Sequence, residues 1–261
     1  MLKIDKTVLP SPEQWQIVIE GMRNPLNSWG RMDSTICPAS GKFEDCPMFP
    51  PTGCPRECDD FEKTEFCMGA SDYDLMERLA AAGSEHAKYR RMLPVWVTIT
   101  APRYWWTEYD TYKVGTVANS CSTMHKIASK EFMPEDFSVE HLLEADRDVL
   151  DVVIDALNFA RHEYLRTKDK RYWWQMIQLL PQSYNQRRTL MLNYEVLATI
   201  YRQRKDHKLA EWHTFCEWIE TLPYSEIIMS SSGLDLNSIN ALQGAARNSS
   251  KGYIYKRKTE D

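Results

Sequence analysis

The sequence lacks a long apolar run and an excess of positive charge. No stretch reaches the roughly 18–20 apolar residues that a membrane-spanning helix needs, and the opening MLKIDKTVLPSPEQW lacks the apolar centre of a signal peptide. The 32 Lys and Arg residues against 37 Asp and Glu give a net charge of −5, which argues against a general nucleic-acid binder. We therefore expect a soluble, cytoplasmic protein with no membrane partner and no general nucleic-acid binding.

The composition is that of a globular chain. Hydrophobic residues make up 43% and charged residues 26% of the 261 residues, enough for one large domain or two small ones. The sequence is rich in aromatic residues, with nine Trp and 13 Tyr. Aromatic side chains can build a core, a stacking site for a planar ligand, or both. Composition leaves these alternatives open.

Hydrophobic periodicity and helix-capping signals predict both helices and strands. The predicted helices cover residues 11–23, 71–83, 119–129, 138–166, 171–180 and 208–222, with another near 193. The predicted strands are 93–100 and a short one after Pro181. We divide the chain into an N-terminal helix and lead-in (1–33), a Cys/Pro-rich insertion (34–69), a core (70–223) and a C-terminal extension (224–261).

The insertion holds most of the cysteines. Within 31 residues lie Cys37, Cys46, Cys54, Cys58 and Cys67. Only Cys54 and Cys58, spaced as C-x3-C, match the usual separation of zinc ligands. A structural zinc held by Cys46, Cys54, Cys58 and Cys67 is one interpretation, and free thiols or disulfides are the other. A catalytic metal is not expected, because no histidine lies within the cluster.

Residues 99–126 form the densest polar and aromatic stretch of the sequence. Such a stretch suits a planar heterocycle with a polar edge, but equally a buried aromatic core. Asp110, Ser122 and His125 also offer the residue types of a hydrolytic triad, although no G-x-S-x-G motif surrounds the serine. Cys121 is more typical of a small core residue than of a nucleophile.

Three motifs lie between about residues 71 and 223. The first is a Glu-His pair in Gly83-Ser84-Glu85-His86, which precedes a predicted strand ending in Ala101-Pro102. The second is Asn119-Ser120-Cys121-Ser122, and the third is Leu180-Pro181, Asn193 and Arg204, followed by Ala210-Glu211-Trp212. These motifs resemble those of the flavin-dependent thymidylate synthases: the second is similar to the N-E-x-S part of R-H-R-x-x-S-x-N-E-x-S-x-R-Y, and the third has the family's L-P…N…R spacing.

The resemblance implies an α+β fold of the flavin-dependent thymidylate synthase type: a mixed sheet with long flanking helices, here carrying the cysteine-rich insertion. It implies a homotetramer with FAD bound between subunits. By the same resemblance His86 and Asn193 would contact the flavin, and we add Lys113 and Asn119 to the cofactor-binding residues.

The activity implied is methylation of C5 of a pyrimidine nucleotide, of the type that converts dUMP to dTMP. Methylenetetrahydrofolate and NADPH would be co-substrates, and the cofactor would perform the difficult step. Ser122 would contact the nucleotide phosphate, and Arg204 would hold the pyrimidine nucleotide. The same scaffold acting on another pyrimidine, or a non-catalytic nucleotide-binding or assembly protein, remains an alternative.

The chain departs from the family motif mainly at cationic positions. Tyr112-Lys113-Val114 replaces R-H-R, and the other replacements are Ser120 for Glu, Met124 for Arg, His125 for Tyr and Ile177 for Arg. Each charge-assisted hydrogen bond is worth about 1.5–3 kcal/mol, so a phosphorylated ligand needs other cations here. The sequence offers Arg103, Lys113, Arg187 and Arg188 as candidates.

Overall fold

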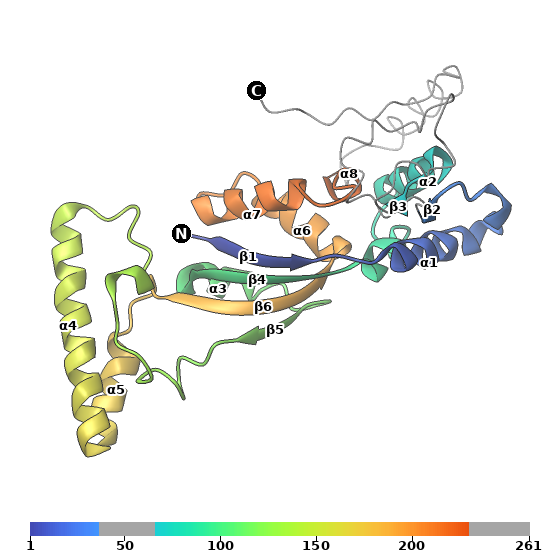
Figure 1. Cartoon of the computed structure of the whole chain (residues 1–261). Helices are drawn as coiled ribbons and strands as arrows, with labels where there is room; N and C mark the ends of the chain where they lie inside the picture. Colours follow the sequence, from blue (N-terminus) through green and yellow to red (C-terminus); the bar gives the residue numbers. More distant parts are fainter. Residues whose placement is uncertain (37–65, 230–261) are drawn as a thin grey trace, which may run out of the picture. The chain divides into compact units, whose positions relative to one another are not determined.

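The computed structural model describes residues 1–36 and 66–229, which divide into two compact units (Figure 1). Unit 1 comprises Met1–Leu9, Val95–Leu192 and Thr199–Leu222. Unit 2 comprises the described parts of Pro10–Pro94, Asn193–Ala198 and the chain from Pro223 onward. The predicted ligands Cys46, Cys54 and Cys58, and the C-terminal extension beyond residue 229, lie outside the described residues.

Unit 1 is built on a four-stranded sheet. In spatial order its strands are β1 (Lys3–Val8), β4 (Pro94–Pro102), β6 (Asn185–Asn193) and β5 (Val117–Ser120). The pairs β1–β4 and β5–β6 are antiparallel. Between β4 and β6, the Thr98 and Thr189 hydroxyls lie 3.0 Å apart, and the Arg103 N–H donates to the carbonyl of Tyr184. Thr98 thus lies opposite Thr189, and Arg103, just after β4, lies opposite Tyr184, just before β6. Because the partner's number falls as the number along β4 rises, β4 and β6 are antiparallel as well.

The sheet therefore differs from the mixed sheet predicted from the resemblance. The burial pattern of β6 gives the physical reason. Gln186, Leu190 and Leu192 are buried and residues between them are more exposed, so only one face of the strand is covered. This alternation is typical of antiparallel sheets, whereas parallel strands are usually buried on both faces.

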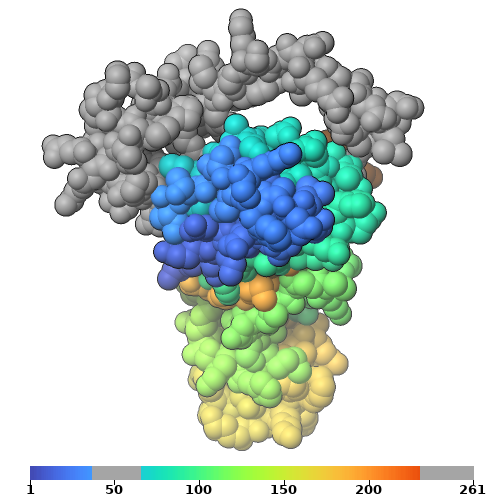
Figure 2. All heavy atoms as spheres, turned by 90° about the vertical axis from the view of Figure 1, so that its right-hand side faces the viewer, coloured from blue at the N-terminus to red at the C-terminus, as the bar shows by residue number. Residues whose placement is uncertain are grey.

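Four helices and one half-helix belong to unit 1. They are α3 (Arg103–Tyr109), α4 (Glu144–Thr167), α5 (Lys170–Leu179), α7 (Ala210–Glu220) and the end of α6 (Tyr194–Arg204), which begins in unit 2. A 3-10 turn, η6, covers Pro134–Asp136. Helices α4 and α5 pack as a hairpin, which Figure 2 shows as one block of yellow-green to yellow atoms. Leu157 and Met176 are fully buried at its centre.

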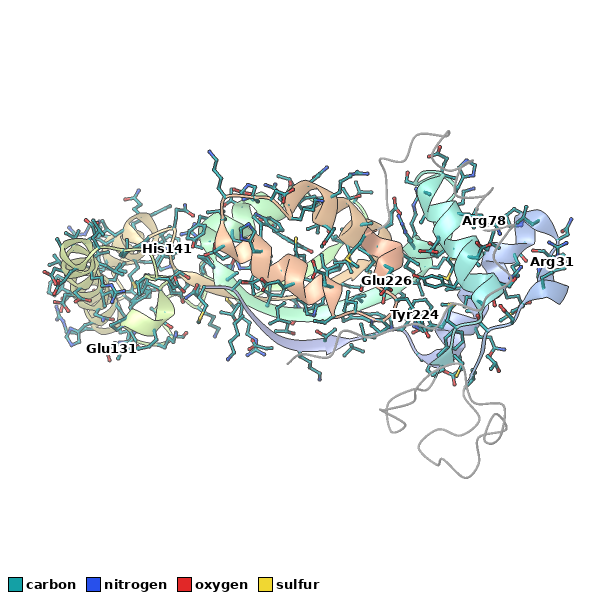
Figure 3. The ribbon with its side chains drawn as sticks, turned by 90° about the horizontal axis from the view of Figure 1, so that it is seen from above. Arg31, Arg78, Glu131, His141, Tyr224 and Glu226 are labelled. Carbon is teal, nitrogen blue, oxygen red and sulfur yellow. The ribbon has the colours of Figure 1, made fainter. Side chains whose placement is uncertain are left out.

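The described part of unit 2 contains helices α1 (Pro12–Arg23), α2 (Ala70–Ala81) and α8 (Glu226–Met229), and a small antiparallel pair, β2 (Thr35–Ile36) with β3 (Phe66–Cys67). The 3-10 segments in that part are η1 (Asn24–Leu26), η2 (Trp29–Arg31) and η5 (Lys88–Met92). Helix α8 contacts α2, and Figure 3 labels Glu226 on the first and Arg78 on the second. Trp15 fills the core, with ring contacts to Phe66, Tyr194 and Tyr224.

Most periodic segments are confirmed. Helix α1 begins after Ser11, which shares a capping box with Gln14, and the helices predicted at 171–180 and 208–222 and the strand–helix pair after Pro181 are present as α5, α7, β6 and α6. The predicted helix 71–83 is α2, although it begins at Ala70 rather than after Ser71. Strand β1 and helix α3 were not predicted.

Two predicted helices need correction. Residues 119–129 do not form a helix: Asn119 and Ser120 belong to β5, and the Ser122 hydroxyl then accepts the backbone N–H of His125. Short polar side chains that bond to the nearby backbone compete with helix formation. The long helix begins at Glu144 rather than at Ser138, whose hydroxyl bonds to Asn185 instead of capping a helix.

Candidate functional site

Arg204 lies in the last turn of α6, and polar and aromatic side chains of unit 1 surround its guanidinium. Its Nη1 is 2.7 Å from Oε2 of Glu108, and its Nε donates to the Tyr112 hydroxyl at 2.8 Å. The guanidinium lies 4.8 Å from the ring centroid of Trp212. The same Glu108 oxygen accepts from the Trp212 indole and lies 3.4 Å from Nε2 of His207. Arg204 thus has a carboxylate partner and an aromatic support within its own unit.

The aromatic residues predicted as a possible stacking site lie mainly in the core. Trp105, Trp106 and Tyr109 are buried, and the Trp105 ring packs 4.8 Å from Trp212 and 5.7 Å from Phe215, centroid to centroid. Burial raises the pKa of the Tyr109 hydroxyl above its usual range. These contacts favour the aromatic-core interpretation over a heterocycle site at these rings.

The other predicted site residues of unit 1 lie on β5 and its flanking turns. Lys113, Asn119 and Ser122 are exposed, and Asn119 pairs with Thr189 across β5 and β6. Among the contacts within the described ranges, none joins Ser122 to Arg204. The structure therefore places the two residues predicted for the nucleotide in one unit, each with other hydrogen-bond partners.

A hydrolytic triad is not assembled. The Ser122 hydroxyl accepts the backbone N–H of His125 at 2.9 Å rather than contacting its ring. The Asp110 carboxylate instead accepts from Nη1 of Arg188 at 2.7 Å. The chemistry of nucleophile and base requires the imidazole beside the hydroxyl, so this alternative loses its support.

The two arginines of β6 offered as replacement cations are also near carboxylates. Arg188 stacks 4.3 Å from the ring centroid of Trp106 and is paired with Asp110. Arg187 is 63% exposed, and its Nε lies 3.8 Å from Oδ2 of Asp5. A phosphate at Nη1 of Arg188 would compete with the Asp110 carboxylate.

The two residues predicted to contact flavin lie in unit 2. Asn193 precedes α6, and its Oδ1 accepts the N–H of Val196 at 3.1 Å as a helix N-cap. His86 is exposed, and its backbone N–H donates to the carbonyl of Gly83 at 3.0 Å. Gly83 has a φ of +113°, a conformation that other residues rarely adopt. It follows the C-cap of α2, Ala82, so the helix stops at this glycine as predicted.

Sequence reasoning missed Arg90, which lies in η5 of the same unit. Its side chain is 2% exposed, and Nη1 is 3.5 Å from Oε2 of Glu195. Its Nε and Nη2 are buried and have no hydrogen-bond partner. Burial raises the pKa of the adjacent Tyr89 to about 12, and its hydroxyl donates to the carbonyl of Met76. No sequence pattern signals this arrangement, because it depends on tertiary burial.

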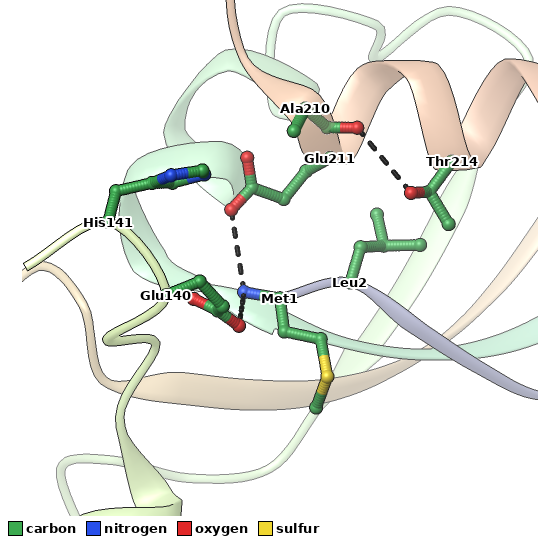
Figure 4. A pocket seen from close by; sticks show the side chains of 7 residues that line it. All are labelled: Met1, Leu2, Glu140, His141, Ala210, Glu211 and Thr214. Carbon is green, nitrogen blue, oxygen red and sulfur yellow. Dashed lines mark hydrogen bonds and ion pairs between the residues drawn. The ribbon is translucent and has the colours of Figure 1, made fainter.

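A pocket in unit 1 is lined by none of the predicted catalytic, cofactor-binding or metal residues (Figure 4). Its volume is about 120 Å³, below the roughly 300–1,000 Å³ of small-molecule sites. The Met1 amino group lies 2.7 Å from Oε1 of Glu140 and 3.5 Å from Oε1 of Glu211, which also accepts from the Tyr104 hydroxyl. The lining residues are Met1, Leu2, Glu140, His141, Ala210, Glu211 and Thr214. The pocket is too small for a nucleotide.

The metal prediction is not decided by the described residues. Cys67 lies in β3 and is half-buried. Within residues 1–36 and 66–229, no three His, Cys, Asp or Glu side chains form a group that could hold a metal ion. The same ranges contain no helix long and apolar enough to cross a membrane.

Among the solved structures that share this fold are two complexes of one enzyme. A flavin-dependent thymidylate synthase ThyX from Helicobacter pylori, in complex with FAD and dUMP, superposes with a TM-score of 0.56 at 14% identity, covering 89% of this chain and 99% of that one. A second structure of ThyX from Helicobacter pylori with FAD and dUMP gives 0.55 at 15% identity, covering 87% and 95%. No family model and no curated protein matches the chain. At this level of identity the comparison shows the fold.

Proposed function

We propose that the chain is a flavin-dependent enzyme that methylates C5 of a pyrimidine nucleotide, with dUMP as substrate and methylenetetrahydrofolate and NADPH as co-substrates. The observation that carries the proposal is the extent of the fold match, which covers 89% of this chain and 99% of a structure bound to FAD and dUMP. A match that extends over nearly all of both chains leaves little room for a different architecture around the site, although fold alone does not establish activity.

The residue roles in this proposal follow the sequence motifs. His86, Asn193, Lys113 and Asn119 would hold FAD, and Ser122 and Arg204 would hold the nucleotide. Bound FAD supplies the electron and one-carbon chemistry that side chains cannot provide. The donor set fits such a group in part: the side chains of His86, Lys113 and Asn119 are exposed.

The side chain of Arg204 already has protein partners at Nη1 and Nε. Its planar guanidinium suits two oxygen atoms at once, and Glu108 now occupies Nη1. A nucleotide that binds Arg204 therefore replaces Glu108 as the oxygen partner or binds beside it. The Trp212 and Tyr112 rings would keep the guanidinium in place during that exchange.

A non-catalytic nucleotide-binding or assembly protein is the second candidate. Two observations favour it: Tyr112-Lys113-Val114 replaces the cationic R-H-R, and Glu108 already neutralises Arg204. An enzyme with the same scaffold that makes another modified pyrimidine is a variant of the first proposal.

The absorption spectrum of the purified protein tests these candidates. A flavin spectrum that shifts when dUMP is added supports thymidylate synthesis, and formation of dTMP from dUMP would establish it. A flavin spectrum that ignores dUMP points to another pyrimidine. Protein that takes up no flavin, even after reconstitution with excess FAD, contradicts the proposal and leaves the non-catalytic candidate.

We also propose that the chain assembles as a homotetramer in the cytoplasm. Helix α4 exposes Val149, Val152 and Phe159 at 64%, 68% and 63%, and apolar residues three or four apart share one helix face. Sedimentation velocity at micromolar concentration should show a species larger than a monomer. A clean monomer would remove any site shared between subunits, and with it this form of the proposal.

A structural zinc held by Cys46, Cys54, Cys58 and Cys67 completes the proposal. One equivalent of metal should then co-purify, and changing Cys54 and Cys58 to Ser should release it, because thiolates are the ligands that zinc prefers. Metal-free protein whose protease resistance is the same in the double variant would contradict this part.

A further inference from the structure

Helix α4 of unit 1 has two apolar stripes, and its own unit covers only one of them. The covered stripe includes Leu150, Ile154 and Leu157, which are buried in the α4–α5 hairpin, and Figure 1 shows α5 running beside α4. The second stripe is exposed along its whole length and consists of Ala145, Val149, Val152, Ala156 and Phe159. We call these five residues the α4 seam.

The spacing of the α4 seam is that of a helix that packs against another helix. Its residues follow one another at intervals of four, three, four and three, which is the a/d pattern of two heptads. At about 100° per residue the five side chains stay within roughly 80° of one another. Three of the five are alanine or valine at the centre of the seam, so a neighbouring helix can approach closely. The seam therefore suits a second helix better than a small molecule.

The charges of α4 indicate which helix fits and in which direction. Residues 144–155 hold five acidic residues and one arginine, whereas residues 156–171 hold five basic residues and two acidic ones. The helix dipole favours acidic side chains at an N-terminus, but its effect fades within the first turn. Asp151 and Asp155 are the eighth and twelfth residues of α4, so the dipole does not explain them. The helix thus has an acidic half and a basic end beside one apolar seam.

We propose that the α4 seam binds the α4 seam of a second copy of this chain, with the two helices antiparallel. Antiparallel pairing lays the acidic half of each helix along the basic end of the other, whereas parallel pairing would bring like charges together. The contact is isologous, because each copy offers the same surface. Val149 then packs against the partner's Phe159, and Val152 packs against the partner's Ala156. The inference rests on the self-assembly proposed above and specifies its surface and orientation.

The two ends of α4 allow the orientation to be tested. Glu144 is the first residue of the helix and Lys168 is its C-cap, so about 36 Å of helix separates them within one chain. A carbodiimide joins a carboxylate to a lysine amine without a spacer and cannot bridge that distance. In an antiparallel pair, Glu144 of each chain lies near the partner's Lys168. A link between these two residues therefore identifies the antiparallel pair.

The first experiment is carbodiimide cross-linking of the full chain, on an equimolar mixture of unlabelled and isotope-labelled protein. Mass spectrometry of the digested product identifies the linked residues and shows which links join two chains. We expect a link between Glu144 of one chain and Lys168 of the other, and Glu144→Gln should remove it. Links between chains that join Lys168 to Glu163 or Asp169 would indicate parallel helices and overturn the proposal.

The second experiment places a charge in the seam. Val152→Glu should raise the dissociation constant of the assembly, measured by sedimentation velocity, by about tenfold or more, because the contact would bury an unpaired carboxylate. Leu165→Glu is the matched control: Leu165 is 41% exposed on the same helix, but by its helical angle it lies opposite the seam. This control should change the dissociation constant little. Circular dichroism checks that both variants keep the fold.

The outcomes separate this pairing from the proposed function. A monomer at micromolar concentration overturns both the pairing and the proposed assembly. An oligomer without the Glu144–Lys168 link, or one in which Glu144 is linked to a lysine beyond residue 229, overturns the pairing alone. Equal effects of Val152→Glu and Leu165→Glu also overturn it, and if Val152→Glu fails to fold, the link in the wild type decides. The link in protein that takes up no flavin supports the pairing while it contradicts the proposed activity.

Discussion

Arg204 in unit 1 lies 2.7 Å from the carboxylate of Glu108 and is supported by the Trp212 ring, whereas Arg90 in unit 2 lies 3.5 Å from the carboxylate of Glu195 and has two buried donors without partners. The sequence motif selects Arg204, and the structure draws attention to Arg90. A buried cation with its partners in place stabilises the fold, whereas buried donors without partners cost free energy. The comparison can be tested by removing satisfied and unsatisfied charges in turn.

The largest effect is expected where a buried arginine is fully satisfied. Arg23→Met leaves the Asp72 carboxylate buried without its cation, so we expect a loss of about 3–5 kcal/mol in the free energy of unfolding. Chemical denaturation would measure it. Arg78→Met is the control, because Arg78 is 50% exposed beside Asp74 and such surface pairs contribute about 0.5 kcal/mol or less. If the two variants lost the same free energy of unfolding, the burial of the Arg23–Asp72 ion pair would not make it more important than the exposed Arg78–Asp74 pair.

A smaller effect is expected on acidification. Burial alone would raise the pKa of Asp72, but hydrogen bonds from Ser34 and the ion pair with Arg23 hold it below its ordinary value of 3.8. The folded state therefore favours the carboxylate, and its contribution to stability is complete at neutral pH and is lost as the pH falls below about 4. Each unit by which the pKa is lowered is worth about 1.4 kcal/mol.

Urea unfolding of the wild type and of Asp72→Asn at pH 7 and pH 3 would measure this contribution. The wild type should be more stable than the variant at pH 7, and the gap should narrow at pH 3. A gap of the same size at both pH values would show that Asp72 does not titrate in this way.

Local signals in the sequence were sufficient for much of the fold. The capping box of Ser11 and Gln14 and the stop at Pro181 depend on neighbouring residues only, so the elements beside them could be predicted. The strand at the start of the polar run 119–129 could not, because Asn119 and Ser120 are extended through their pairing with β6. The domain boundaries at 33, 69 and 223 stay predictions.

The site was harder to predict than the fold. The sequence places Arg204 on a helix after Asn193, as the structure does, but Glu108 lies 96 residues away along the chain. No local pattern could reveal that pair. The burial of Arg90 is equally invisible in the sequence, because the segment Lys88–Met92 shows no motif and only tertiary packing covers the side chain.

A moderate effect on stability is expected at Arg204. The side chains of Arg204 and Glu108 are 18% and 34% exposed, so solvent screening limits their coupling to about 1 kcal/mol in a double-mutant cycle of Arg204→Ala and Glu108→Ala.

Under the proposed function, Arg204→Ala should also abolish dUMP binding in calorimetry, and Arg204→Lys should rescue poorly because the planar two-point contact is lost. Unchanged affinity for dUMP in Arg204→Ala would remove Arg204 from the nucleotide site.

The smallest effect is expected at Lys205, the matched control for Arg204. Both substitutions to Ala remove one positive charge from the end of the same helix, but Lys205 is exposed. We expect Lys205→Ala to change the free energy of unfolding by less than about 0.5 kcal/mol and to leave dUMP affinity nearly unchanged. If long-range attraction were responsible, the positive charge of either residue would raise the affinity for dUMP, and salt would weaken the effect. If the guanidinium contacts dUMP directly, only the change at residue 204 lowers the affinity. If Lys205→Ala weakens dUMP binding as much as Arg204→Ala does, and 0.5 M salt abolishes both effects, the role of Arg204 is general electrostatic attraction and not recognition.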